Sequence, residues 1–547
     1  MTETLDLDDI QGNIVRAYGR YNYPVARYFF LQFTDLSKAR PFVGAVRRKV
    51  TTAARWTAER PETTLNIGFT FFGLLALGLP TRLLQELPDA FIAGMRARAY
   101  ALGDRDPAAV AVGQEGWDKH WDTLWQENRV DDSKTAGNVH VWISINAQVE
   151  PGTDTPVEKI EEETEWLIDL CERELEGGVR IMTGHGSHAD IPFQAATALF
   201  ETLPDGTRRA TPKEHFGYTD GISDPVFAGQ YPPEIERERV IGRGKWMDPE
   251  TGWQPLATGE FLLGHVDESQ ALPPTAPPPE FMRNGSFMVY RKLHQNVDAF
   301  RNAMDVEAER YAAATGVDAE AARATVAAKV VGRWKDGVPL AKAPDYAAWR
   351  ALAAEKGFDD PETAREAYQR YFRTAEASDF RYGDDMDGAR CPLGAHLRRA
   401  NTRDQLDPDN QPGAKNPEAT SRLNKRRRIL RRGLPYGPSD PDAGSDDGEQ
   451  GIIFMAICAD IFRQFEFIQQ QWMEYGLDFH TGNTPCPLIG RGAEGKIHVI
   501  QADPEGEAPP FIMREMKTFV ETRGGDYFFL PSMTALRLIE MGVVDPT

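Results

Sequence analysis

The chain is poor in cysteine and in clustered histidines, and each shortage excludes a class of protein. Its 547 residues include four cysteines, which lie far apart and form no CxxC pair. A disulfide framework and a thiolate metal site are therefore disfavoured, and reduced thiols are expected. The ten histidines form no HExxH or HxH arrangement, which argues against a structural zinc site.

Long hydrophobic runs and targeting features are also missing. The longest apolar stretch, Ile67 to Pro80, is interrupted by Thr and Gly and is shorter than the ~18 residues that a membrane span requires. The N-terminus is acidic and polar, without the basic region, apolar region or twin arginines of an export signal. We therefore expect a cytoplasmic location. The net charge of −21 repels nucleic acid and anionic membranes, so we expect neither as a partner.

Strand-like runs recur in both halves of the chain. They lie at Tyr28–Phe33 and Val139–Ile145 in the first half, and at Ser286–Tyr290 and Ile452–Ile457 in the second. An amphipathic helix, Phe462–Tyr475, follows the last of them. The repeated strand–helix–strand rhythm predicts an α+β fold built by duplication, because a chain of this length exceeds the usual size of one domain.

Helical patterns fill much of the remaining sequence. Two of them, Pro88–Leu102 and Gly116–Arg129, lie between the strand-like runs of the first half. A stretch rich in Ala and charge, about residues 304–382, interrupts the second half with helical spacing. We expect this stretch to be a solvated helical insertion.

Three segments contain side chains that could carry chemistry. Asp220 lies between Gly217 and Gly221, where glycines let the backbone turn tightly and approach a planar ligand; on the local pattern alone, an ordinary Asx turn is the favoured explanation. His396 follows small and apolar residues and precedes a group of arginines, which suits an iron porphyrin with one axial nitrogen and two propionates; a core histidine beside a basic loop remains the alternative. Arg431 ends an arginine-rich run that is otherwise typical of a solvent-facing surface.

Six motifs together resemble the dye-decolorizing peroxidase family, and the match covers nearly the whole chain. The segments around the three candidate residues are similar to the family's GxxDG, CPxxAHxRxxNxR and xILRxGxPYG patterns. Supporting matches are DIQGNI, NGSFMVYRKLHQ and RGGDYFFLPS. In chain order, the six motifs are Asp9–Ile14, Gly217–Gly221, Asn284–Gln295, Cys391–Arg403, Ile429–Gly437 and Arg523–Ser532.

The resemblance implies a role for each matched position. His396 is implied as the axial ligand of the haem iron, with Asp220 and Arg431 on the peroxide side. Arg403 matches a propionate-binding arginine, and Ile452 and Phe454 match apolar positions of the distal face. The remaining cofactor-binding position is the carboxylate partner of the proximal imidazole. We assign it to Asp460, with Glu466 as the alternative.

The same resemblance implies the fold and the activity. It predicts two ferredoxin-like halves with antiparallel sheets and peripheral helices, residues 1–210 and 211–547, with the haem in the C-terminal half. It implies a peroxidase with one haem b per chain that reduces hydrogen peroxide and oxidises aromatic or dye-like donors. The length resembles the larger, bacterial branch of the family, in which Mn²⁺ can also be a donor and homo-oligomers occur. The alternative is a protein of the same fold that handles haem or iron with little peroxidase turnover.

Overall fold

The computed structural model describes most of the chain. The residues that it describes are 5–56, 59–104, 114–127, 138–186, 190–273, 275–360, 363–410, 419–440, 445–491, 496–501, 508–514 and 516–544. Parts of two expected features lie outside them, the last two residues of the predicted helix 116–129 and two residues of the insertion. Among the helices of the described residues, none is long and apolar enough to cross a membrane.

The first half is built on a four-stranded antiparallel arrangement. The strands pair in the order β2-β3-β1-β4, and helices α2 and α7 connect β1 to β2 and β3 to β4. This β-α-β-β-α-β order is that of a ferredoxin-like unit. The bounds are β1 Val25–Phe33, α2 Leu36–Arg47, β2 Thr63–Phe69, β3 Val141–Ala147, α7 Lys159–Asp169 and β4 Val179–Ile181.

The second half repeats the same order. Its strands pair as β11-β13-β10-β16, which is again second, third, first and fourth in sequence. The expected duplication is therefore confirmed at the level of topology, and the predicted domain boundary at residue 210 stays a prediction. The bounds are β10 Ser286–Gln295, α10 Val297–Thr315, β11 Leu430–Arg432, β13 Gly451–Cys458, η4 Phe462–Glu466, η5 Ile468–Met473 and β16 Val520–Leu530.

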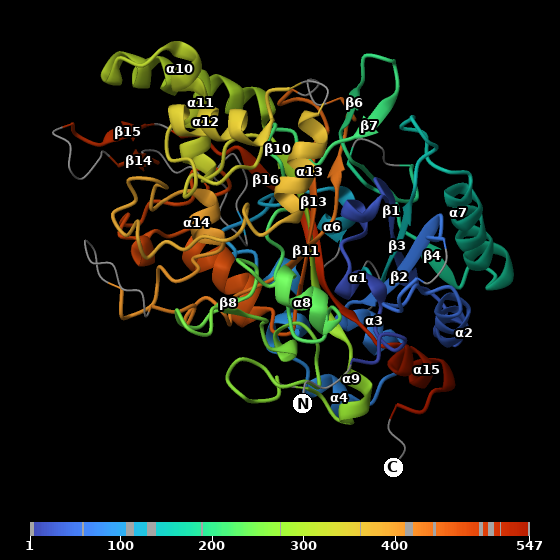
Figure 1. Cartoon of the computed structure of the whole chain (residues 1–547). Helices are drawn as coiled ribbons and strands as arrows, with labels where there is room; N and C mark the ends of the chain where they lie inside the picture. The colour runs from blue at the N-terminus through green and yellow to red at the C-terminus, as the bar shows by residue number, and fades with distance from the viewer. Residues whose placement is uncertain are drawn as a thin grey trace.

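The two halves share one continuous sheet, which runs through the middle of the molecule in Figure 1. They meet where β16 lies beside β2, at the register pair Phe69 and Phe529. Gln11 of the DIQGNI motif reinforces this junction. Its fully buried side-chain amide donates to the carbonyls of Ile67 and Pro531, each at 2.8 Å. This motif therefore holds the two halves together.

Side chains alternate along the strands between two apolar cores, one on each face of the sheet. On β1, Phe29 and Leu31 enter the core on one face, whereas Tyr28 and Phe30 enter the core on the other. Glycine is required where β16 bends past β10, at an irregularity in their register. A Cβ on Gly524 would lie only 2.1 Å from the ring of Trp125, so no larger residue fits there.

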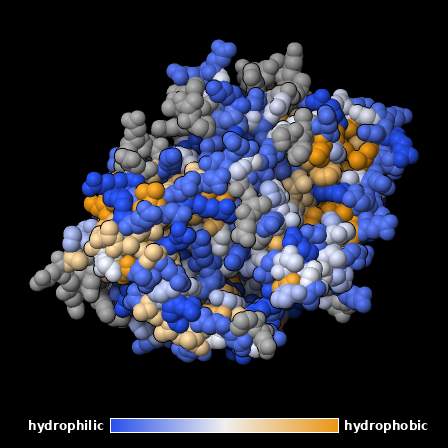
Figure 2. All heavy atoms as spheres, turned by 90° about the horizontal axis from the view of Figure 1, so that it is seen from above, coloured by the Kyte–Doolittle hydropathy of each residue, from blue (hydrophilic) through white to orange (hydrophobic). Residues whose placement is uncertain are grey.

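The insertion consists of helices, as expected. Helices α10, α11 (Ala319–Val331) and α12 (Tyr346–Lys356) lie together at one end of the molecule, away from the first-half sheet (Figure 1). Figure 2 shows that polar residues dominate the face seen there, with apolar patches scattered over it. The segment after β13 differs from the expected α-helix 462–475, because its turns are of the wide π type in η4 and η5.

The remaining elements lie outside the two four-stranded units. Those of the first half are α1 Gly12–Val15, η1 Tyr18–Tyr21, α3 Phe71–Ala76, α4 Thr81–Gln85, α5 Asp89–Ala97, α6 Thr123–Glu127, η2 Leu170–Glu174, β5 Gln194–Thr197, β6 Phe200–Thr202 and β7 Arg208–Ala210. Those of the second half are α8 Pro233–Arg239, β8 Lys245–Trp246, β9 Trp253–Gln254, η3 Thr258–Glu260, α9 Pro279–Met282, α11 Ala319–Val331, α12 Tyr346–Lys356, α13 Ala364–Arg373, α14 His396–Ala400, β12 Pro435–Tyr436, η6 Leu477–Phe479, β14 His498–Ile500, β15 Phe511–Met513 and α15 Met533–Met541.

Candidate active site

Asp220 and Arg431 are in direct contact. The Arg431 guanidinium donates from Nη1 to Asp220 Oδ1 at 2.6 Å, although the two residues are 211 positions apart in the chain. Both side chains are partly exposed, at 30% for Arg431 and 45% for Asp220, so the pair is open to a small molecule from solvent. Burial opposes the charge of Arg431, but the carboxylates of Asp220 and Asp224 outweigh it and raise the pKa of the guanidinium.

The loop that carries Asp220 is held by a buried carboxyl. Glu214 accepts from the backbone N–H groups of Phe216 at 2.9 Å and Tyr218 at 2.8 Å. Burial raises the pKa of Glu214. Gly217 and Gly221 on either side of Asp220 have φ of +91° and +87°, the left-handed conformation that favours glycine. The GxxDG motif is thus a tight, fixed turn that presents one carboxylate.

Arg431 lies on the short strand β11 and shares a face of the sheet with the predicted distal residues. It pairs in register with Ala456 of β13, and residues two and four positions earlier on β13, Phe454 and Ile452, point to the same side. Both are half-buried, whereas Ile453 and Met455 between and beside them are buried in the opposite core. The structure therefore places Arg431, Ile452 and Phe454 on one face of the sheet, with Asp220 in contact with Arg431.

His396 is the first residue of the short helix α14. Its imidazole is partly exposed, and its Nδ1 lies 3.4 Å from the sulfur of Cys486. In the part of the chain that the structure describes, Nε2 makes no hydrogen bond, so this nitrogen is available to a metal. Leu397 beside His396 and Ile429 near Arg431 pack against the same apolar cluster.

Cys486 is a feature that the sequence did not reveal. It is fully buried, and its backbone N–H donates to the carbonyl of Met473 at 2.7 Å. Burial alone raises the pKa of the Cys486 thiol, but His396 and Arg399 beside it reverse the effect and lower the pKa to about 6. The lone cysteine in PCPLIG carries no motif that sequence analysis could have recognised.

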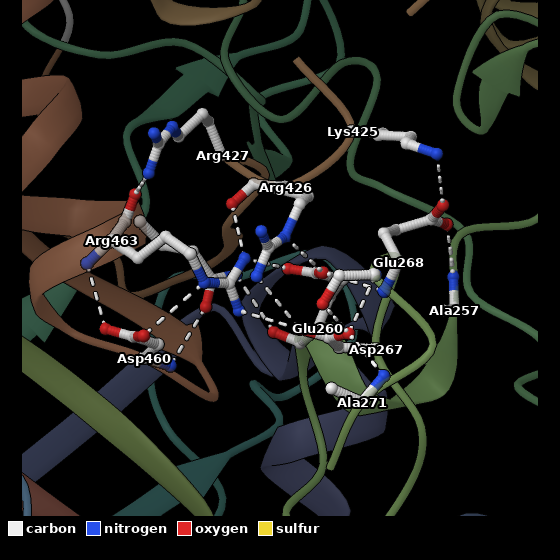
Figure 3. Close-up of polar contacts among 12 residues, drawn as sticks. Ala257, Glu260, Asp267, Glu268, Ala271, Lys425, Arg426, Arg427, Asp460 and Arg463 are labelled. Carbon is white, nitrogen blue, oxygen red and sulfur yellow. Dashed lines mark hydrogen bonds and ion pairs between the residues drawn. The ribbon is translucent and has the colours of Figure 1, made fainter. Parts of the chain in front are cut away.

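The assignment of Asp460 as the partner of the proximal imidazole is wrong. Asp460 lies at one side of a charged network, where it accepts from the backbone N–H of Arg463 at 2.9 Å and from the Arg463 guanidinium at 3.4 Å (Figure 3). Glu466 does not contact His396 either, because it pairs with Arg98 and accepts from the Tyr527 hydroxyl. Asp460 follows the end of β13, and Arg463 lies three positions after it. The carboxylate of Asp460 therefore pairs with this nearby cation.

The arginines after His396 do not act as one cationic patch. Arg398 is fully buried and pairs with Asp385 at 2.8 Å. Arg399 donates to backbone carbonyls, among them those of Trp472 and Tyr475, both at 3.1 Å. Both therefore anchor α14 within the protein. Arg403 forms no ion pair with a carboxylate within the described residues, since its Nη1 donates to the carbonyls of Gly242 and Phe380 and its guanidinium also hydrogen-bonds Tyr382.

Comparison with known proteins finds relatives that match nearly the whole chain. No family model matches the chain. The multifunctional dye peroxidase DyP2 of Amycolatopsis sp. is 28% identical over 97% of this chain and 95% of its own length. The dye-decolorizing peroxidase msp1 of Mycetinis scorodonius is 26% identical over 98% and 88%. A solved ancestral D-type dye-decolorizing peroxidase has a TM-score of 0.67 and 25% identity over 98% of this chain and 99% of its own.

Over nearly its whole length the chain is similar to dye-decolorizing peroxidases. This similarity implies haem, and the residues present can be tested against that group. Three buried arginines, Arg333, Arg403 and Arg428, lie close enough for their charges to interact. Burial and the charge of Arg403 lower the pKa of Arg428 to about 9 and that of Arg333 to about 10.

These three cations of the peroxidase have no carboxylate partner within the described residues. Arg428 donates to the carbonyl of Gly244, and Arg333 donates to the carbonyls of Gly337 and Ala377. Because a buried cation is stable only when it is paired, such a set is suited to an anionic group, as the two propionates of haem are. With the available Nε2 of His396 and the apolar Ile452 and Phe454, the donor set fits haem. The sequence analysis did not identify Arg333 and Arg428 as cofactor-binding residues. Arg428 lies in an arginine-rich run that is typical of a solvent-facing surface.

Proposed function

We propose that this chain is a haem-dependent peroxidase that reduces hydrogen peroxide and oxidises aromatic, dye-like donors in one-electron steps. The contact between Asp220 and Arg431 carries the proposal, because it places a carboxylate and a permanent cation side by side at a position open to a small molecule. Haem bound through His396 would supply the iron chemistry by which peroxide is reduced. The relatives that are named dye-decolorizing peroxidases support the same activity.

Asp220 is the proton carrier in this proposal. Peroxide must transfer a proton from one oxygen to the other before its O–O bond breaks. The Asp220 carboxylate accepts this proton as a base and returns it as an acid. The fixed turn between Gly217 and Gly221 holds the carboxylate in place while it does so.

Arg431 supplies fixed positive charge. Its guanidinium stabilises the negative charge that develops on the peroxide and keeps Asp220 ionised between turnovers. A further hydrogen bond from Nη2 to the carbonyl of Ile222, at 3.3 Å, orients it toward the Asp220 loop. Because its pKa is raised, Arg431 keeps its charge over the whole working range of pH.

The other residues bind the cofactor. His396 would donate Nε2 to the iron, and Arg403 would hold a propionate together with Arg333 and Arg428. Ile452 and Phe454, half-buried on the sheet face of Arg431, would limit water around the reacting groups. The expected content is one haem b per chain.

Three finer expectations are included in the proposal. Mn²⁺ as a donor is tested by formation of a Mn³⁺ complex with malonate; the described residues contain no group of three or more metal-binding side chains. A homo-oligomer is tested by light scattering of the purified protein. A cytoplasmic location is tested by cell fractionation.

The deciding experiment is an absorption spectrum of the haem-loaded protein before and after one equivalent of hydrogen peroxide, with His396→Ala measured beside it. We expect a ferric Soret band that changes on addition of peroxide and that is weak or displaced in the variant. Haem binding without any change on peroxide would indicate the haem-handling alternative. A protein that takes up no haem would contradict the proposal.

A further inference from the structure

Within the described residues, the His396 imidazole contacts the sulfur of Cys486 and no carboxylate. The distance from Nδ1 to the Cys486 sulfur is 3.4 Å. Within the described part of the chain, Cys486 is the one side chain that hydrogen-bonds this imidazole. The two carboxylates expected there, Asp460 and Glu466, are engaged by Arg463 and by Arg98. The contact is therefore a property of this chain that its motifs did not predict.

The surroundings of the sulfur make it a hydrogen-bond acceptor. Cys486 is 0% exposed, so water does not compete for its sulfur. The backbone N–H of Ile489 donates to it, and the charge of Arg399 acts on it. These two interactions favour the His396 Nδ1–H as donor and the sulfur as acceptor. That direction leaves Nε2 as the nitrogen with a lone pair for iron.

Two independent ties fix the position of Cys486 relative to His396. The Arg399 guanidinium, on the same helix as His396, donates to Thr481 Oγ at 3.0 Å and to the carbonyl of Thr484 at 2.9 Å. These two residues precede Cys486 in its own loop. The loop is also held by the hydrogen bond from Cys486 N to the Met473 carbonyl. The contact between imidazole and sulfur is therefore built into the packing of α14 against this loop.

We propose that Cys486 is a positioning residue that orients His396 and sets how strongly its imidazole donates to the haem iron. The inference rests on the proposed haem function and deepens it. The partner of a metal-bound imidazole tunes the basicity of that imidazole. Whatever its charge, a large and polarisable sulfur accepts a weaker hydrogen bond than a carboxylate oxygen does. Cys486 therefore gives an iron ligand of lower donor strength than a carboxylate at the same place would give.

The test compares Cys486→Asp, Cys486→Ser and Cys486→Ala with the wild type, all loaded with haem. Two quantities are measured, the ferric–ferrous reduction potential by spectroelectrochemistry and the iron–histidine stretching frequency of the ferrous protein by resonance Raman. We expect Cys486→Asp to lower the potential and raise the frequency, and Cys486→Ala to do the reverse. Cys486→Ser, which conserves size, should fall between them. The control is Cys171→Ala, a buried cysteine of the first half, which should leave both quantities unchanged.

The outcomes separate this inference from the proposed function. Unchanged potential and frequency in Cys486→Ala and Cys486→Ser would overturn the inference even if the aspartate variant fails to fold. A shift of equal size in Cys171→Ala would overturn it as well, because a general loosening of the core would then explain the effect. Failure of the wild type to bind haem would overturn the proposed function itself.

Discussion

Arg431 and Arg432 are neighbours on β11 and serve different parts of the molecule. Arg431 donates to Asp220, whereas the Arg432 guanidinium donates to the carbonyls of Asn13 and Ile14, from Nε at 2.5 Å and from Nη2 at 2.6 Å. Arg432 also pairs with Asp224 at 3.0 Å. One arginine therefore faces the candidate reaction site, and the next ties its strand to the N-terminal segment.

Replacing Asp220 by asparagine should slow the reaction of the ferric protein with hydrogen peroxide by about 10²–10⁴-fold, because the proton carrier is lost. Stopped-flow absorption at the Soret band measures this step. The spectrum before peroxide should stay that of the wild type. Asp205→Asn, an exposed carboxylate in a turn, is the control. An unchanged rate in the Asp220 variant would remove this residue from the mechanism.

The two neighbouring arginines should give opposite phenotypes. Arg431→Leu should slow the peroxide step by about 10²–10³-fold, because one stabilising donor is removed from the developing charge. Arg432→Leu should leave that rate near the wild-type value and lower the stability, since the carbonyls of Asn13 and Ile14 lose a buried partner. Stopped-flow kinetics and urea unfolding measured on both variants check this. Equal rates in the two variants would contradict the assignment of Arg431.

Loss of a propionate-binding cation should weaken the binding of haem to the protein. Arg403→Leu should lower the affinity for haem by about 10–100-fold, which corresponds to a charge-assisted hydrogen bond of about 1.5–3 kcal/mol. Transfer of haem to an apomyoglobin acceptor measures the change in dissociation. Arg208→Leu, an arginine of the first half paired with Asp154, is the control and should leave haem affinity unchanged. Wild-type affinity in Arg403→Leu would place the propionates elsewhere.

The free energy of unfolding should fall at acid pH, because a buried histidine binds a proton more readily in the unfolded chain than in the folded one. Burial lowers the pKa of His498 to about 3, from 6.5 in the unfolded chain. Between these values the unfolded state binds a proton that the folded state does not, so this stabilisation is lost as the pH falls below 6.5. The loss from this group is about 1.4 kcal/mol per pH unit. Urea unfolding at pH 7 and pH 5 should show a smaller difference for His498→Gln than for wild type. The exposed His480→Gln should keep the full difference.

The network in Figure 3 should be a determinant of stability. Glu260 is fully buried and pairs with Arg463 at 2.6 Å, close to Asp267 and Arg426. Glu260→Gln should lower the free energy of unfolding by about 3–5 kcal/mol, because it leaves a buried cation without its partner. Urea unfolding of the variant and the wild type measures this, with exposed Glu250→Gln as the control. A stability within error of wild type would show that Arg463 is neutralised by its other partners.

Short-range patterns allowed much of the fold to be predicted. Short continuous apolar runs located the four segments that became β1, β3, β10 and β13, since strands buried on both faces show such runs. Strands as short as β11 were out of reach, because three residues carry no period. Wide turns in η4 and η5 were missed for a related reason, as π and α turns share nearly the same apolar spacing.

The candidate site shows where sequence reasoning stops. Asp220, His396 and Arg431 were identified through motifs. Cys486 and Arg333 act through contacts across 90 and 110 positions, with His396 and with Ser223, and no local pattern reports such contacts. Asp460 failed for the same reason, because proximity in sequence to β13 said nothing about which cation the side chain would meet.

The place of β16 in the sheet has a consequence for biosynthesis. This strand lies between β10 and β2, so it completes the second-half sheet and joins it to the first in one step. Among the described residues it is also the last strand of this sheet in chain order, at Val520–Leu530. A nascent chain can form the first half early, but the sheet behind the candidate haem site stays open until residue 530 has left the ribosome. Loading of the cofactor therefore belongs after the synthesis of β16, when this strand has closed the sheet.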